Sequence, residues 1–131
     1  MSSQTNKVTI GDNNTIHGSV VAAQSILNSF NSVDKVGFGQ DIQDALNTLK
    51  DSTKLLVEQL ENKTEADAVS RDVKGFCEEV NTDAPRERTL QYYLSSIGDV
   101  ASKAGAIGLK VIGAISSLSP LLKLIAEHAS N

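Results

Sequence analysis

Apolar residues recur at every third or fourth position along most of this chain, and that spacing constrains the fold more than any other feature. A spacing of three and four places side chains on one face of an α-helix, whereas a half-buried strand alternates at every second position. In the clearest example, residues 40–61, the apolar stripe consists of Ile42, Leu46, Leu49, Leu56 and Leu60. The spacing predicts helices over residues 19–31, 40–61, 65–81, 84–118 and 120–128. The expected fold is therefore mainly α, a bundle of about four helices with a long, glycine-containing C-terminal helix.

Composition limits the core and the classes of partner. The 131 residues include two Tyr, three Phe and no Trp, so a core must come from Leu, Ile, Val and Ala. The formal net charge is −4 and no Lys/Arg cluster stands out, so we expect no nucleic-acid partner. One cysteine allows no disulfide within the chain, and the first residues lack the pattern of a secretory signal. We therefore expect a cytoplasmic protein.

No group of residues has the spacing of an active site or of a metal site. His17 and His128 have no H-x-x-x-H or cysteine partner. Cys77 lies on an apolar helix face, where we predict a buried small hydrophobe. Glu78 and Glu79 are adjacent on a helix and point apart, which is typical of a solvated edge. We expect no catalytic, cofactor-binding or metal-binding residues.

The N-terminal stretch has a different period. After a polar lead, residues 1–6, the sequence KVTIGDNNTIHGSVV over residues 7–21 alternates apolar and polar side chains on either side of Gly-Asp-Asn-Asn. This pattern predicts a short β-hairpin or β-arc, followed by a helical domain over residues 22–131. An isolated hairpin of this size is only marginally stable in water, so it needs a partner.

The first half of this stretch, VTIGDNN over residues 8–14, resembles the RIP homotypic interaction motif, whose pattern is apolar-Gln-apolar-Gly. Thr9 stands where that family most often has Gln. The resemblance implies that a short amyloid-type segment recruits further copies and that a helical domain acts, often at a membrane, in defence or cell-death signalling. It also implies two partners: other copies of the chain, and a sensor protein that carries a similar β motif.

Stacking of identical segments explains how such a motif would assemble. In-register chains form side-chain amide ladders and a dry apolar zipper, and each backbone edge pairs with the next chain. The residues expected to carry self-assembly are Val8, Ile10, Gly11, Asn13, Asn14 and Ile16. A hairpin that lies on its own helical bundle is the alternative, and an open fibre and a closed ring remain equally compatible with the sequence.

The C-terminal third is apolar and nearly uncharged. Between residues 101 and 125 the charged residues are Lys103, Lys110 and Lys123. Lys110, Pro120 and the lack of an aromatic belt argue against a permanent transmembrane helix. Small residues recur at a spacing of three and four, namely Gly98, Ala101, Gly105 and Gly108. Such a stripe predicts either close helix packing in a soluble bundle or conditional membrane insertion.

Together these features predict a non-enzymatic, self-assembling protein. Its β motif drives homotypic oligomerisation, and its helical domain is membrane-active on activation. The alternative is a structural or adaptor homo-oligomer, a ring sealed by β pairing between chains, with no membrane role.

Overall fold

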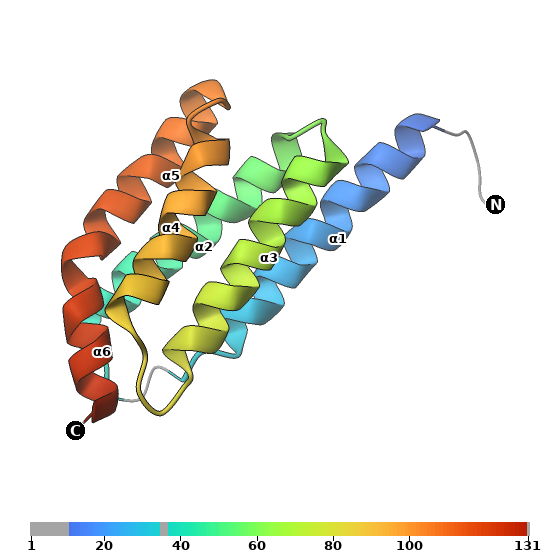
Figure 1. Cartoon of the computed structure of the whole chain (residues 1–131). Coiled ribbons are helices and arrows are strands. Elements are labelled where there is room, and N and C mark those ends of the chain that lie inside the picture. The colour runs from blue at the N-terminus through green and yellow to red at the C-terminus, as the bar shows by residue number, and fades with distance from the viewer. Residues whose placement is uncertain (1–10, 35–36, 131) are drawn as a thin grey trace.

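The chain is a bundle of antiparallel helices (Figure 1). The computed structural model describes the backbone of residues 11–34 and 37–130, and the side chains of all of these except 11–19 and 128–130. The α-helices are α1 (Gly11–Asn31), α2 (Gln40–Gln59), α3 (Lys63–Val80), α4 (Glu87–Ala101), α5 (Gly105–Leu118) and α6 (Leu122–Ser130). A 3-10 turn, η1 (Ser119–Leu121), joins α5 to α6. The prediction of a mainly helical bundle is confirmed.

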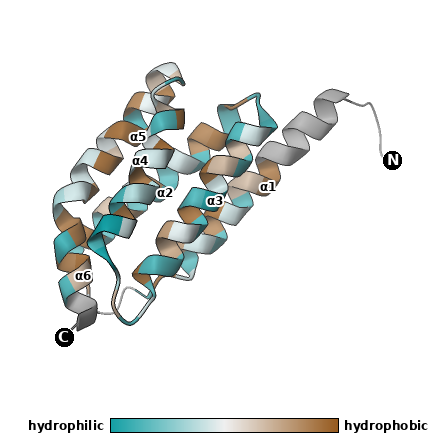
Figure 2. Cartoon of the chain, viewed as in Figure 1, coloured by the Kyte–Doolittle hydropathy of each residue, from teal (hydrophilic) through white to brown (hydrophobic). Residues whose placement is uncertain are grey.

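Helix contacts form a closed ring around one core. Helix α1 packs against α2 and α3, α3 against α4, α4 against α5, and α5 returns to α2. Hydrophobic and hydrophilic residues are interspersed along α2, α3 and α4, as amphipathic helices require (Figure 2). The largest fully buried side chains are Phe30, Phe76, Ile26, Leu46, Leu49, Leu56, Leu90, Leu94, Ile97, Leu118, Leu122 and Ile125. The core is thus aliphatic with two phenylalanines among its largest members.

Helices α2 and α3 lie within two residues of the predicted bounds. The α2 stripe is buried from Ile42 to Leu56. Helix α3 begins one residue after Asn62, whose side-chain oxygen accepts a hydrogen bond from the backbone N–H of Glu65 at 3.1 Å. Asn62 therefore satisfies one of the free N–H groups of the first turn.

Helix α1 begins earlier than the spacing predicts. It starts at Gly11 rather than near residue 19, so the backbone of residues 11–21 is helical in this single chain. The alternating sequence pattern predicts β-type backbone there. Ala22, Ala23, Ile26 and Phe30 of the same helix are buried, and no strand in the described residues offers the stretch a partner. Residues 7–10 lie outside the described residues, so a β element formed between chains stays a prediction.

The predicted helix over residues 84–118 is wrong in one respect, because the structure has two helices there. Helix α4 ends at Ala101, a tight turn follows over residues 102–104, and α5 runs back along α4. The expected restart at Pro120 is confirmed, since η1 contains that proline and α6 follows directly. The C-terminal third is therefore a helical hairpin with a long second arm.

Candidate functional site

The turn between α4 and α5 is closed by backbone hydrogen bonds and by one glycine. The N–H groups of residues 102, 103 and 104 donate to the carbonyls of Gly98, Val100 and Ala101 at 2.8, 3.1 and 3.0 Å. Gly105 then adopts a φ of +65°, in the left-handed region that side chains with a Cβ avoid. Gly105 is the first residue of α5, and its left-handed backbone completes the reversal of the chain after the turn.

The two arms of the hairpin touch where Gly108 faces the end of α4. A Cβ on Gly108 would overlap the carbonyl oxygen of Ala101 and lie 2.8 Å from its carbonyl carbon. Further along, a Cβ on Gly98 would sit 3.6 Å from Cδ1 of Ile115, an ordinary contact across the same pair of helices. The predicted small residues therefore do not form a stripe on one helix. Gly98 and Ala101 lie on α4, Gly108 faces them from α5, and Gly105 shapes the turn.

From this turn a continuous apolar rod runs to the C-terminal end of the described residues. Its segment Gly105–Glu127 comprises 23 residues of α5, η1 and α6 and is long and apolar enough to cross a membrane. It is the one such segment among the described residues. The residues of the rod that face the core are Gly108, Val111, Ala114, Leu118, Leu122 and Ile125.

The other apolar residues of the rod are partly buried or exposed, and those that pack partly against the core are Ile107, Ile112, Ile115 and Leu121. Only 28% of the most apolar stretch of the rod is buried inside the bundle. The core helix of a soluble protein is, in contrast, mostly buried. Leu109 on α5 is 69% exposed, and Leu124 on α6 is 47% exposed. The rod is thus apolar on the face that contacts the bundle and also carries large apolar side chains on the opposite face.

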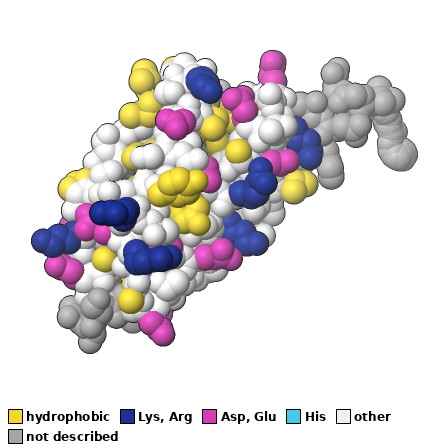
Figure 3. Space-filling view, viewed as in Figure 1, with side chains coloured by type: hydrophobic (Ala, Val, Ile, Leu, Met, Phe, Trp, Pro, Cys, Tyr) yellow, Lys and Arg dark blue, Asp and Glu magenta, His cyan; other side chains and the backbone are white. Residues whose placement is uncertain are grey.

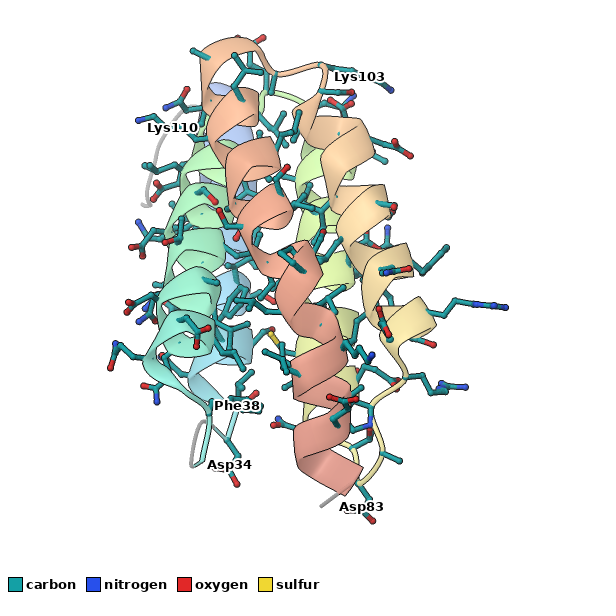
Figure 4. The ribbon with its side chains drawn as sticks, turned by 90° about the vertical axis from the view of Figure 1, so that its left-hand side faces the viewer. Asp34, Phe38, Asp83, Lys103 and Lys110 are labelled. Atoms are coloured by element: carbon teal, nitrogen blue, oxygen red, sulfur yellow. The ribbon has the colours of Figure 1, made fainter. Side chains whose placement is uncertain are left out.

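Charge on the rod is sparse, and the one acidic residue of Gly105–Glu127 is Glu127 at its end. Between Gly105 and Ala126 the only charged residues are Lys110 and Lys123, and Lys103 lies in the preceding turn. Among the described side chains, none of these three lysines has an ion-pair partner. Figure 4 shows Lys103 and Lys110 on opposite sides of the hairpin end, both pointing away from the bundle.

A buried carboxylate joins α3 to α4 at the other end of the bundle. Glu79 Oε2 accepts the backbone N–H of Arg86 at 2.8 Å and the Nε of the same residue at 3.4 Å. Burial alone would raise the pKa of Glu79. The hydrogen bonds and charge of Arg86 outweigh that effect and hold the pKa below its ordinary value of 4.5. The prediction of a solvated Glu79 is wrong, because this side chain is buried and accepts the N–H of Arg86, the residue that precedes α4.

A groove of about 670 Å³ lies between α1 and α3. Most of its lining residues are polar, but the surface that they expose to the groove is mainly apolar, and the side chains of Val20 and Val21 are exposed. Cys77 lies beneath the groove and is buried, as predicted. Among the described side chains, no group of three His, Cys, Asp or Glu residues could hold a metal ion.

The residues predicted to carry self-assembly fall at the start of the chain. Val8 and Ile10 lie outside the described residues. Gly11, Asn13, Asn14 and Ile16 lie on the first turns of α1, where the backbone alone is described. The assembly prediction and the apolar rod therefore concern opposite ends of the sequence.

No protein-family model matches this sequence, and no curated protein or solved structure is significantly similar to it.

Proposed function

We propose that the chain is a non-enzymatic, self-assembling membrane effector in defence or cell-death signalling. In this proposal residues 7–21 pair with other copies of the chain or with a sensor that carries a similar motif. The rod Gly105–Glu127 then leaves the bundle and enters a bilayer. The observation that carries the proposal is the combination of length, apolarity and low burial in this rod.

The dimensions of the rod match those of a bilayer. At a rise of about 1.5 Å per residue it spans about 34 Å, against about 30 Å for the hydrocarbon core. Lys110 lies about 8 Å from one end and Lys123 about 6 Å from the other. Both side chains can therefore reach the interface while their stems stay in the apolar layer. The twelve residues between them, 111–122, carry no charge.

Local hydrogen bonding lowers the cost of placing this sequence in lipid. The hydroxyl of Ser119 donates to the carbonyl of Ile115 at 2.9 Å, one turn earlier in the helix. Pro120 has no N–H that would need an acceptor. In hydrocarbon every polar backbone group must be satisfied within the protein, and these features help to meet that condition at the break between α5 and α6.

A charge placed at the centre of the rod tests insertion without touching the core. Ser116 lies midway between Gly105 and Glu127 and is exposed in the bundle. Ser116→Asp adds about 3 kcal/mol to the cost of insertion, so we expect dye leakage from liposomes to fall by about 100-fold at equal protein concentration. The matched control is Ser95→Asp on α4, which is also exposed and adds the same charge. Equal leakage from the wild type and both variants would refute insertion of the rod.

A second variant separates assembly from membrane activity. Ile10→Asp adds a charge to the segment expected to stack, so we expect a smaller particle by light scattering with unchanged helical circular dichroism. If the variant keeps the wild-type mass, residues 7–21 are not the assembly element. An assembled wild type that never releases dye would instead identify the chain as a structural or adaptor oligomer.

A further inference from the structure

The exposed face of the α5–α6 rod has an unusual combination of side chains. Leu109 and Leu124 are the most exposed large apolar residues of the rod, and each is next to a lysine in the sequence. Successive helical residues are about 100° apart around the axis. Lys110 follows Leu109 while Lys123 precedes Leu124, so the two lysines border the leucines from opposite sides.

Charge distinguishes this face from the neighbouring one. Over α3 and α4, Lys and Arg side chains are interspersed with Asp and Glu (Figure 3). From residue 102 to residue 126 there is no acidic residue, although the whole chain contains 16 acidic and 12 basic residues. The three lysines at positions 103, 110 and 123 have no ion-pair partner among the described side chains. Residues 102–126 therefore carry only positive charge within a protein of negative net charge.

We infer that the closed bundle docks on anionic lipid bilayers through this face, before any helix leaves the core. The leucines enter the boundary between headgroups and acyl chains, and Lys110 and Lys123, which border them, contact lipid phosphates and carboxylates, while Lys103 adds positive charge at the hairpin end. This layout is that of an interfacial helix, with apolar residues bordered by lysines whose stems lie along the apolar layer. The inference rests on the proposed function, since it names the lipid class that the effector recognises, but it requires neither assembly nor insertion.

Vesicle sedimentation tests the charge requirement with the full chain. We expect binding to phosphatidylcholine vesicles that contain phosphatidylserine and little binding to pure phosphatidylcholine. Each lysine near the surface contributes about fivefold to the partition coefficient, so Lys103→Ala, Lys110→Ala and Lys123→Ala together lower binding by about 100-fold. Added salt weakens the wild-type binding, because it screens these charges.

The matched control removes three exposed cations from another face. Lys63, Arg71 and Lys74 lie on α3, which packs on α1 and α4 rather than on α5. Their replacement by alanine changes the net charge by the same amount and should leave binding close to that of the wild type. Equal losses in the two triple variants would overturn the proposed face, as would equal wild-type binding to both kinds of vesicle.

The absence of tryptophan allows a direct test of which side chains meet the lipid. In Leu109→Trp the single indole should shift its emission to the blue with anionic vesicles. Tyr92 on α4 is 66% exposed, close to the 69% of Leu109, so Tyr92→Trp is a matched control that should show no shift. A shift in the control alone would overturn the inference.

The two proposals fail in different ways. Charge-dependent binding without dye leakage would refute the proposed function and leave the docking face standing. Leakage that is equal for neutral and anionic vesicles, and unchanged by the triple lysine variant, would refute the docking face and leave the proposed function standing.

Discussion

Two glycines on the same helix should respond in opposite directions to the same substitution. Gly108 and Gly113 both lie inside α5, three and eight residues after Gly105. In an exposed helix interior, Gly→Ala stabilises by about 1 kcal/mol, because alanine loses less backbone entropy on folding. A Cβ on Gly113 meets no atom within 4 Å, so Gly113→Ala should gain that amount.

At Gly108 the same methyl group collides with the backbone of α4. It overlaps the carbonyl oxygen of Ala101 and lies 3.2 Å from the Cβ of Ala104. A carbonyl held in a helix terminus cannot rotate away as a long side chain can, so the two arms must move apart. Overpacking costs about 1–3 kcal/mol, and the rigid neighbour favours the upper end. After the helix-propensity gain is subtracted, Gly108→Ala should destabilise by about 2 kcal/mol.

Urea and thermal unfolding followed by far-ultraviolet circular dichroism measure both effects. We expect the melting temperature to fall by about 8 °C for Gly108→Ala and to rise by about 4 °C for Gly113→Ala. The m-value, which is the slope of the unfolding free energy against urea concentration, should be equal in both variants and the wild type. The shifts in the urea midpoint then report changes in stability alone. If Gly108→Ala is as stable as the wild type, or if both variants move in the same direction, the close contact at Ala101 does not hold the hairpin together.

Two further predictions concern the contacts of α3. Glu79→Gln keeps an acceptor for the N–H of Arg86 but removes the charge, so the free energy of unfolding at neutral pH should fall by about 1 kcal/mol. Because the pKa of Glu79 is lowered in the folded state, the ionised carboxylate adds stability above pH 4.5, and this stability is lost as the pH falls through the folded-state pKa. The Glu79→Gln variant should therefore lose less stability on acidification than the wild type. Urea titrations at several pH values measure this difference. Gly75→Ala places a Cβ 2.5 Å from the ring of Tyr93 and should destabilise by about 1–3 kcal/mol. That penalty should shrink in a Tyr93→Ala background, and an unchanged penalty in this double-mutant cycle would contradict a direct clash.

The helices that the sequence predicts well are those with an unambiguous apolar stripe. In α2, Ile42 and Leu49 are buried because a 3-4 spacing leaves one face for the core. The start of α3 was harder to predict. The spacing of Thr64 and Asp67 is typical of a capping box, which would place the helix start at Thr64. The helix instead begins at Lys63, and Asn62 is its N-cap residue. Such errors of one or two residues at helix ends follow from the similar capping ability of several polar side chains.

The break between α4 and α5 was beyond sequence reasoning for a physical reason. Residues 102–104 contain no proline, and glycine costs only about 1 kcal/mol in a helix, so the local signal for a break is weak. Packing of α5 on both α2 and α4 decides in favour of the hairpin. Glu79 was missed for a similar reason, since its partner Arg86 lies seven residues away, beyond the end of the helix.

The left-handed conformation of Gly105 sets how far the C-terminal third can extend. Glycine populates left-handed and right-handed backbone conformations about equally, so straightening at this residue needs little local strain energy. A single helix over residues 87–118 would be about 48 Å long, roughly twice the length of α4 or of α5 alone. The apolar spacing that predicts such a helix is present in the sequence, so one turn determines whether this segment is folded back or extended beyond the end of the bundle.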